Sequence, residues 1–193
     1  MEIKNFIKIY DDVLPLTAIA TLVKWGSKAS FQDAGIISSD EGCINGVQKN
    51  VRNTKTISLN NKSSSLTNVH YCMLVGRTCM DGIQKYVKDL NIHDFQVNGI
   101  NDIQLLKYET GGFYTWHIDH AGEIIPRTMS CILFLNDDYK GGELIFRDPN
   151  GENEMAIKPK SSRLIIWPSS FMYPHTVKPV TEGTRYSVVA WAV

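Results

Sequence analysis

Three strand-like runs separated by turn signals fill residues 163–193, RLIIWPSSFMYPHTVKPVTEGTRYSVVAWAV. The runs RLIIW, HTVK and RYSVVAWAV are rich in β-branched and aromatic residues, whereas proline, serine and glycine collect between them. β-Branched and aromatic side chains favour the pleated strand, and glycine and proline favour turns. The end of the chain therefore predicts short strands joined by turns.

The same pattern extends back to residue 102. The earlier runs are IQLLKY, FYTWHI, TMSCILFL, ELIF and MAIK, and the turn signals among them include ETGG, NDDYKGG, RDPNGEN and KPKSS. Short strands at this spacing are typical of an all-β sandwich, barrel or jelly roll and not of βαβ units. We expect residues 101–193 to form an antiparallel jelly-roll core.

The first hundred residues have a different pattern. Residues 14–29 and 65–90 carry apolar side chains at helical spacing, although two glycines weaken the second helix. The polar, glycine-bearing residues 30–53 predict a mobile loop, which leads into a strand at about residues 54–59. This half of the chain therefore predicts a helical support for the strands.

Length and composition favour a single domain. With 193 residues, of which 43% are hydrophobic, the chain can bury one full core. We therefore expect one domain over residues 1–193, with a helical support region over residues 1–100 and the jelly-roll core over residues 101–193. The expected fold class is mainly β (α+β), a jelly roll with N-terminal helices packed on it.

Charge and cysteine usage limit the function classes. Lys+Arg and Asp+Glu are equal at 20 each, so no bulk field attracts nucleic acid or an anionic membrane. The N-terminus lacks a secretory signal pattern, and no run approaches the roughly 18 apolar residues of a membrane span. We expect a soluble cytoplasmic protein with free thiols, because its cysteines lack Cys-x-x-Cys spacing: Cys43, Cys72, Cys79 and Cys131.

His117 and Asp119 are the first candidate metal ligands. Side chains at i and i+2 of a strand share a face about 6.6 Å apart, so both can reach one ion. A third ligand must come from elsewhere in the fold, and His175 is the histidine on another predicted strand of this half. The other histidines lie in the second helix, in a connector, and directly after Asp119 where the side chain should point away: His70, His93 and His120.

Two histidines and one carboxylate leave three coordination positions open. This is the arrangement of non-haem Fe(II) oxygenases. Imidazole and carboxylate ligands also hold zinc, manganese or nickel, so the ligand types alone leave the metal open.

Arg185 is a second candidate site residue. It alternates with Ser187, Val189 and Trp191 along the last predicted strand. A charge inside a core must be paired, and a guanidinium matches a carboxylate with two hydrogen bonds. A dicarboxylate that chelates the metal at one end and meets Arg185 and Ser187 at the other would satisfy both sites.

The motifs together resemble a known family. They are YETGGFYTWHID (108–119), RTMSCILFLNDDYKGGELIF (127–146) and RLIIWPSSFMYPHTVKPVTEGTRYSVVAW (163–191). In order and spacing they resemble the prolyl 4-hydroxylase-like branch of the Fe(II)/2-oxoglutarate dioxygenases, especially the bacterial PKHD-type hydroxylases. The similarity runs from about residue 103 to residue 193.

The resemblance implies a double-stranded β-helix, the cupin-like form of the jelly roll, and a set of roles. His117, Asp119 and His175 would be the catalytic Fe(II) ligands, and 2-oxoglutarate would be held by Tyr108, Arg185 and Ser187. The implied reaction uses O2, with ascorbate as a further cofactor, and hydroxylates a C–H bond with release of succinate and CO2. A prolyl or other peptidyl side chain is the substrate first implied, and a small molecule is the other.

One position departs from the family pattern, and two alternative functions stay open. Prolyl hydroxylases often carry a second cosubstrate-binding tyrosine where this chain has Phe134, so either Ser187 takes over its hydrogen bond or cosubstrate affinity falls. Nucleic-acid demethylases use the same chemistry, but typically have a second arginine where this chain has Trp191. A non-catalytic jelly-roll binding module, or a metal-bound cupin with another reaction, has no need of a buried arginine opposite the metal.

Two segments are candidate lids over the predicted site. They are the residues 35–52 and 120–127, which are polar or glycine-bearing. Such segments commonly move to cover a substrate.

Overall fold

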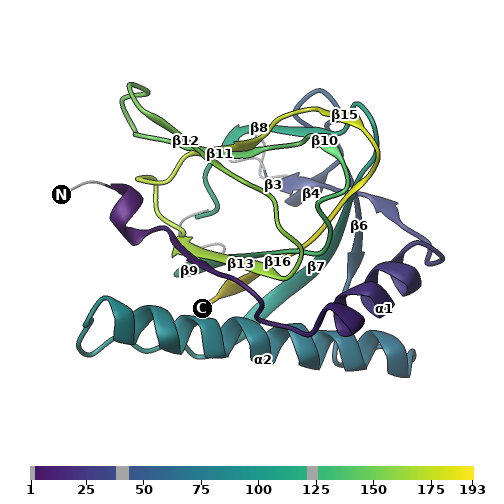
Figure 1. Cartoon of the computed structure of the whole chain (residues 1–193), viewed down its shortest axis with the longest axis horizontal. Helices are drawn as coiled ribbons and strands as arrows, with labels where there is room; N and C mark the ends of the chain where they lie inside the picture. Colours follow the sequence, from purple (N-terminus) through teal and green to yellow (C-terminus); the bar gives the residue numbers. More distant parts are fainter. Residues whose placement is uncertain (1–2, 38–43, 121–125) are drawn as a thin grey trace.

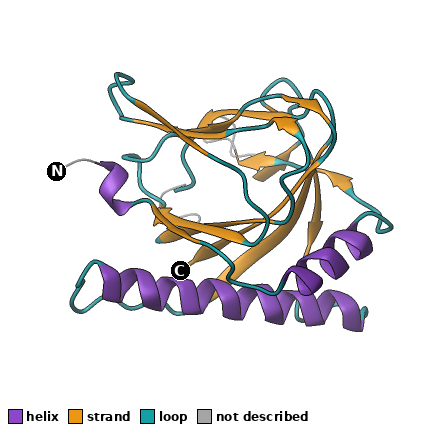
Figure 2. Ribbon diagram, viewed as in Figure 1, coloured by secondary structure: helices purple, strands orange, loops and turns teal. Residues whose placement is uncertain are grey.

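The computed structural model describes residues 3–37, 44–120 and 126–193. Two layers of strands lie over each other, and the helices α1 (Leu16–Gly26) and α2 (Leu66–Asp89) run below the larger sheet (Figure 1). Figure 2 shows strands throughout both layers, with α1 and α2 on one outer side and a short 3-10 helix near the N-terminus at the end of the layers. The fold is therefore mainly β with helical support, as the sequence predicts. Parts of both candidate lids lie outside the described residues.

The larger sheet has seven strands, and every pairing in it is antiparallel. Its four central strands come from the second half of the chain. Strands from the first half flank them, β1 on one side and β6 and β2 on the other. In order the strands are β1 (Lys8–Tyr10), β13 (Arg163–Pro168), β9 (Met129–Phe134), β16 (Arg185–Ala192), β7 (Ile100–Tyr108), β6 (Lys55–Ser58) and β2 (Gln32–Asp33).

The smaller sheet has five strands and carries both histidines of interest. In order they are β12 (Glu154–Ile157), β11 (Leu144–Arg147), β14 (His175–Val177), β8 (Phe113–His117) and β5 (Arg52–Asn53). The remaining elements are a short 3-10 helix and two strand pairs: η1 (Ile3–Phe6), β10 (Lys140–Gly141) with β15 (Val180–Glu182), and β3 (Ile36–Ile37) with β4 (Ile44–Gly46). The two antiparallel sheets form the jelly roll expected from the strand pattern.

Strand β16 separates two hydrophobic cores. Because side chains alternate along a strand, its residues divide between the faces of the larger sheet. Tyr186, Val188, Ala190 and Ala192 join the core on the helix side, which contains Val75, Cys79 and Ile83 of α2. Val189 and Trp191 join the core that includes residues of both sheets. Arg185 and Ser187 lie on the same face of β16 as Val189 and Trp191, so the predicted anion site lies between the sheets.

Helix α2 approaches the larger sheet closely at Gly82. A Cβ atom at this position would lie 2.6 Å from a methyl of Leu164 and 2.8 Å from one of Ile166, both on β13. Ser65 caps the helix by accepting a hydrogen bond from the Asn68 N–H. The glycine that weakens the helical pattern therefore serves packing.

Within the described residues, no helix is both long and apolar enough to cross a lipid bilayer.

The first half contributes more strands than its sequence predicts. The interpretation of residues 30–53 as a loop is wrong in part, because β2, β3, β4 and β5 lie there. The strand expected at residues 54–59 is confirmed as β6. Two- and three-residue strands are too short to show a period of two. Their pairing comes from β6 for β2 and from β8 for β5, whereas β3 and β4 pair with each other. Residues 1–100 therefore extend both sheets as well as supporting them.

Candidate active site

Three metal-ligating side chains meet between the sheets. His117 ends β8, His175 begins β14, and the two residues are direct partners in the antiparallel pairing of these strands. Asp119 follows two residues after His117. The candidate ligand atoms of the three side chains all lie within 4.8 Å of one another. The structure thus brings together the three residues that the sequence singles out as ligands.

Backbone carbonyls orient both imidazole rings. The His117 Nδ1 lies 2.8 Å from the Thr115 carbonyl oxygen, and the His175 Nδ1 lies 3.0 Å from that of Tyr173. A carbonyl can only accept, so each Nδ1 carries the proton and each Nε2 keeps a free lone pair. The Nε2 atoms lie 3.9 Å (His117) and 3.6 Å (His175) from the carboxylate oxygens of Asp119. Both rings are therefore set to donate to one ion beside Asp119.

A pair of buried serines and an arginine hold Asp119. The Ser130 hydroxyl donates to Asp119 Oδ2 over 2.7 Å, and the Ser169 hydroxyl lies 2.7 Å from that of Ser130. Arg127 Nη1 donates to the Asp119 carbonyl oxygen over 3.3 Å. Arg127 itself stacks on Trp191, with its guanidinium carbon 3.5 Å from the ring centroid. The carboxylate is therefore fixed through contacts from β9 and from the end of β13.

The electrostatics of the site favour the protonation states that a metal needs. Burial, with a contribution from His175, lowers the pKa of His117 to about 3. Burial alone would raise the pKa of Asp119, but His175, His117, the Ser130 hydroxyl and Arg127 together hold it below its ordinary value. At neutral pH His117 is thus neutral and Asp119 ionised, as metal ligands must be.

A bulge in β8 places an aromatic ring against His117. His175 pairs with His117, and Val177 pairs with Tyr114. One residue of β14 and two residues of β8 therefore lie between these two pairs. The extra residue brings Tyr114 onto the same face as His117, and their rings stack with centroids 3.5 Å apart. Trp116 instead faces outward, where Arg147 lies 4.2 Å from its ring centroid. Strict alternation along β8 predicts the outward position of Trp116 but would have placed Tyr114 on that outer face as well.

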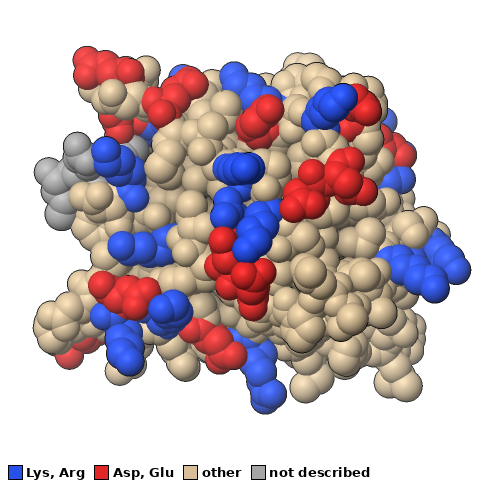
Figure 3. Space-filling view, viewed as in Figure 1, with Lys and Arg blue, Asp and Glu red and all other residues tan. Residues whose placement is uncertain are grey.

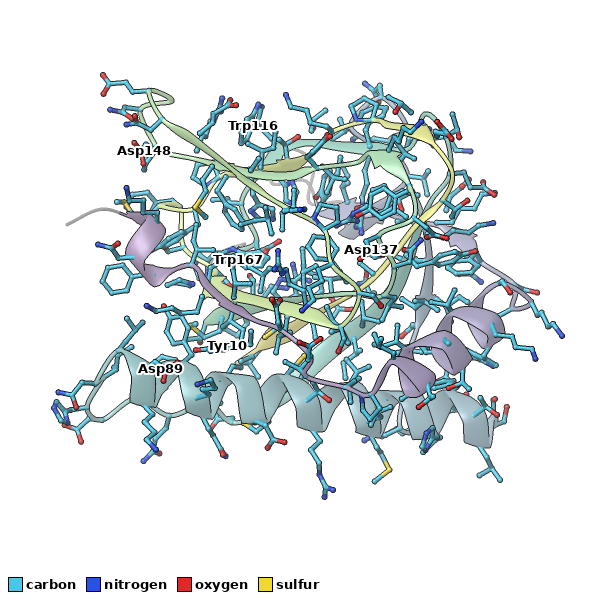
Figure 4. All side chains as sticks on the ribbon, in the orientation of Figure 1. Tyr10, Asp89, Trp116, Asp137, Asp148 and Trp167 are labelled. Carbon is cyan, nitrogen blue, oxygen red and sulfur yellow. The ribbon has the colours of Figure 1, made fainter. Side chains whose placement is uncertain are left out.

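Further aromatic rings enclose the histidines. The ring centroids of Phe146 and Trp167 lie 5.5 and 5.1 Å from that of His175. Figure 4 shows Trp167 between the two layers and Trp116 on the outer side of the smaller sheet. Burial raises the pKa of Tyr114 to about 12, so its phenol stays neutral. The metal side of the site is therefore a largely apolar wall with a few fixed polar groups.

The predicted anion side has unsatisfied donors. Arg185 is fully buried, and its Nη1 donates to the Ser187 hydroxyl over 3.0 Å. Its Nε and Nη2 have no hydrogen-bond partner among the described residues. The guanidinium carbon lies 4.9 Å from the ring centroid of Tyr108 and 5.1 Å from that of Phe134. A buried charge with unpaired N–H groups is costly, so this pocket calls for an anion.

Strand pairing explains why these residues meet. Arg185 pairs with Tyr108 of β7, and Ser187 pairs with Phe134 of β9. Tyr108 and Phe134 belong to the same core as Phe146 and Trp167 of the metal side, and Tyr114 packs against that core. The two ends of the site therefore share one interior.

The excluded histidines lie outside this group. His120 is exposed, and its Nδ1 lies 3.3 Å from the Arg127 carbonyl oxygen. His93 is exposed, and His70 packs its ring edge against Tyr71 with centroids 5.3 Å apart. The sequence interpretation of all three as non-ligands agrees with their positions.

Comparison with known proteins relates the second half of the chain to a family. Residues 103–193 match the model of the 2OG-Fe(II) oxygenase superfamily. This match covers slightly less than half of the chain. The resemblance drawn from the motifs is therefore confirmed, and the oxygenase match coincides with the strands that carry the ligand cluster and Arg185.

Curated relatives of this chain are similar over part of their length. A PKHD-type hydroxylase of Stenotrophomonas maltophilia (strain R551-3) is 42% identical over 93 residues, which are 44% of this chain and 40% of that protein. Prolyl 3-hydroxylase 2 of Homo sapiens is 44% identical over 66 residues, which are 34% of this chain and 9% of that protein. The matched part therefore spans less than half of each relative.

Solved structures share the oxygenase fold over nearly the whole chain. A prolyl hydroxylase from Trichoplax adhaerens, in complex with a hypoxia inducible factor peptide fragment, gives a TM-score of 0.74 at 18% identity, covering 97% of this chain and 83% of that one. A Pseudomonas putida prolyl-4-hydroxylase gives 0.70 at 19% identity, covering 97% and 92%. The double-stranded β-helix is thus confirmed.

Proposed function

We propose that this protein is an Fe(II)- and 2-oxoglutarate-dependent dioxygenase that hydroxylates a C–H bond of a peptidyl side chain, prolyl first, with release of succinate and CO2. One observation carries the proposal. A His-Asp-His ligand cluster and a buried arginine with unpaired N–H groups share the interior of one jelly roll. In this proposal His117, Asp119 and His175 are the catalytic metal ligands, and Tyr108, Arg185 and Ser187 bind the cosubstrate.

The residues present fit both implied groups. Two neutral imidazoles and one carboxylate suit Fe(II) and leave coordination positions for a chelating ligand and O2. The unpaired Nε and Nη2 of Arg185 suit the distal carboxylate of 2-oxoglutarate, since an arginine fork pairs with two carboxylate oxygens. When bound, the iron supplies O2 activation coupled to oxidative decarboxylation of 2-oxoglutarate.

The chain itself supplies position and exclusion of water. The carbonyls of Thr115 and Tyr173 fix the imidazole orientation, and Ser130 fixes the carboxylate. The rings around the histidines remove water from the metal side, which limits turnover without substrate. Arg185 holds the cosubstrate by its distal end, so that its keto acid end is directed to the ligand cluster. We propose that residues 1–193 act as one unit in this work.

The surroundings of His175 support a peptide substrate. A cavity of about 750 Å³ lies along β11 and β12 and the turn between them, and its lining includes Phe146 and Met172 but none of the three proposed metal ligands. Phe146 is the strand partner of His175, so this cavity borders the site on one side. Phe171 and Met172 are 67% and 38% exposed, and Ile118 between the other two ligands is 41% exposed. An apolar rim suits an apolar side chain such as proline. A free amino acid or other small molecule is the alternative substrate.

The surface supports a protein or peptide partner over nucleic acid. Acidic and basic side chains are interspersed over the face in Figure 3, and no single-sign area dominates it. Net charge is +0, so nothing in the overall field favours a polyanion.

The proposal also includes ascorbate as a cofactor and a reducing, cytoplasmic setting, which suits the free thiols of Cys72, Cys79 and Cys131.

The test is turnover of 2-oxoglutarate with added Fe(II). We expect succinate and CO2 release that rises with a panel of proline-containing peptides, together with a mass gain of one oxygen atom on the preferred peptide. His117→Ala or Asp119→Ala should abolish both signals, because each removes a ligand. His93→Ala, at an exposed histidine of a connector, is the matched control and should retain them.

Two results would reject parts of this proposal. Unchanged turnover in both ligand variants would reject the site. Absence of 2-oxoglutarate binding and turnover in the wild type would favour a non-catalytic binding module, and oxidation of methylated nucleic acid instead of peptides would favour a demethylase.

A further inference from the structure

The position of Phe134 leaves the anion side one hydroxyl short of the family pattern, and Tyr139 lies where it can supply one. Tyr139 stands in the turn between β9 and β10 and is only 8% exposed. Its hydroxyl is buried and donates no hydrogen bond to a described residue, and the only described polar side chain that acts on it as a donor is Arg185, which offsets in part the rise in pKa that burial causes. A buried phenol whose proton has no acceptor costs free energy, whereas phenylalanine would fill the same space without that cost.

Hydrogen bonds tie the turn that carries Tyr139 to both neighbours of Arg185. The Asn136 side chain donates to the Thr184 carbonyl over 2.7 Å and accepts from the Tyr186 N–H over 2.7 Å. These two residues stand on either side of Arg185 in the sequence. The turn is therefore held at the end of β16 from which the guanidinium extends.

Two glycines make room for the tyrosine ring beside the arginine. A Cβ atom on Gly142 would lie 3.2 Å from Arg185 Cδ and 3.3 Å from Tyr139 Cε2, so both side chains lie against this residue. Gly142 also has a φ of +65°, which favours glycine. A Cβ atom on Gly183 would lie 3.3 Å from Tyr139 Cβ. A side chain at Gly142 would crowd both the Tyr139 ring and Arg185, and one at Gly183 would crowd the base of the Tyr139 side chain.

The donors at this place outnumber the acceptors. Arg185 has free N–H groups at Nε and Nη2, and no described carboxylate forms an ion pair with it. Ser187 already accepts from Arg185, so its own proton is free to be donated. Burial raises the pKa of Tyr139, and the nearby Arg185 offsets this only in part, so the phenol keeps its proton at neutral pH. One carboxylate has enough lone pairs for all these donors.

We propose that Tyr139 is a binding residue for the distal carboxylate of 2-oxoglutarate and replaces the tyrosine hydroxyl that Phe134 lacks. Phe134 keeps an aromatic face toward the guanidinium, and the hydroxyl comes instead from the turn after β9. This inference rests on the proposed function and adds to it a residue to which the resemblance assigns no role. It also replaces the two alternatives drawn from the sequence, takeover by Ser187 and loss of affinity.

Calorimetric titration of the Mn(II)-loaded protein with 2-oxoglutarate tests the inference without turnover. Tyr139→Phe removes one oxygen atom and should weaken binding about tenfold to a hundredfold, the range for a hydrogen bond to a charged group. The second probe is 2-oxobutyrate, which has the same keto acid end but no distal carboxylate. Its affinity should be the same for wild type and variant.

Two further variants make the result specific. Tyr186→Phe is the matched control, because this tyrosine lies on the same strand as Arg185 but faces the helix-side core. Its 2-oxoglutarate affinity should equal that of the wild type. The double variant Tyr139→Phe with Phe134→Tyr should recover at least half of the lost affinity on a logarithmic scale, since the hydroxyl returns at the family position. Thermal unfolding of each variant checks that the fold is retained.

The outcomes separate this inference from the proposed function. If wild type and Tyr139→Phe bind 2-oxoglutarate equally, the role of Tyr139 is overturned while the cosubstrate site stands. An equal loss of 2-oxobutyrate affinity would also overturn it, because the effect would then not come from the distal carboxylate. If the wild type does not bind 2-oxoglutarate at all, both the proposed function and this inference fail.

Discussion

The two ends of the site are organised in opposite ways. At the metal end each ligand side chain already has a hydrogen-bond partner: Thr115 for His117, Tyr173 for His175 and Ser130 for Asp119. At the anion end the polar atoms of Arg185 and Tyr139 are held by packing, and several of them lack partners. The proposed metal end is thus preorganised by the protein, whereas the proposed anion end would be completed by its ligand.

This difference implies different energetic costs. Oriented ligands lose little freedom when an ion binds, so the hydrogen bonds at the metal end raise metal affinity. An unpaired buried guanidinium destabilises the ligand-free protein and is compensated only when an anion binds. The protein should therefore gain more stability from 2-oxoglutarate than contact area alone would suggest.

The largest expected effect comes from Arg185→Met, which removes the buried charge and keeps an apolar chain. Affinity for 2-oxoglutarate should fall about 30-fold to several thousandfold, since loss of one partner of a buried charge pair costs about 2–5 kcal/mol. The ligand-free protein should become more stable, by about 1 kcal/mol or more, because the unpaired charge is gone. Calorimetric titration and thermal unfolding measure the two changes.

Arg163→Met is the control for that variant, because Arg163 is already paired with Asp11 over 2.7 Å. It should lose stability and keep its 2-oxoglutarate affinity. If Arg185→Met instead destabilised the ligand-free protein and bound 2-oxoglutarate normally, the contrast between the two ends would be wrong.

A smaller effect is expected for Ser130→Ala at the metal end. Without the Ser130 hydroxyl, Asp119 loses its side-chain donor, and metal affinity should fall about 10- to 100-fold. Metal titration by calorimetry checks this, and 2-oxoglutarate affinity at saturating metal should not change. Ser161→Ala removes a hydroxyl that donates to the Leu135 carbonyl and serves as the control. Equal metal affinity in wild type and Ser130→Ala would show that Asp119 needs no support.

The smallest effect is expected for Asp11→Asn, which lies outside both ends of the site. Arg163, opposed in part by burial and helped by Lys160, lowers the pKa of Asp11 from 3.8 to about 2. Because the folded-state pKa lies below the unfolded value, the contribution to stability is present above pH 3.8 and is lost as pH falls through about 2. The pair is partly exposed, so it should contribute no more than about 1 kcal/mol.

Denaturant unfolding of wild type and Asp11→Asn between neutral and acidic pH measures this contribution. The difference in unfolding free energy should shrink at low pH and at high salt. Metal and 2-oxoglutarate affinities should stay at wild-type values. A change in either affinity would show that a loss of stability far from the site is enough to alter binding there.

The ligand cluster and the core strands could be predicted because their signals are local or periodic. His117 and Asp119 are separated by one residue on a strand, and Arg185 stands out as a charge in an apolar run. The runs of the second half are long enough to show their strand character. The helices α1 and α2 were also predicted, with ends that differ by a few residues from the structure.

The remaining features depend on partners distant in sequence. Ser130 meets Asp119 only because β9 passes behind the ligands, and nothing in the run TMSCILFL marks it. Tyr139 sits among turn residues, and its partner Arg185 is brought to it by the pairing of β9 with β16. The edge strands β2 and β5 take their conformation from β6 and β8. Such tertiary contacts override what a short sequence window can show.

The bulge in β8 also gives a marker for comparing chains. Tyr114 stands three residues before His117, an interval at which a regular strand would turn its ring to the opposite face. An alignment that slides a gap into this segment would pair the stacking tyrosine with an outward-facing residue such as Trp116. The three-residue spacing between tyrosine and histidine is therefore a sequence signature of the β-bulge. Relatives with the same spacing should also have the stacked ring.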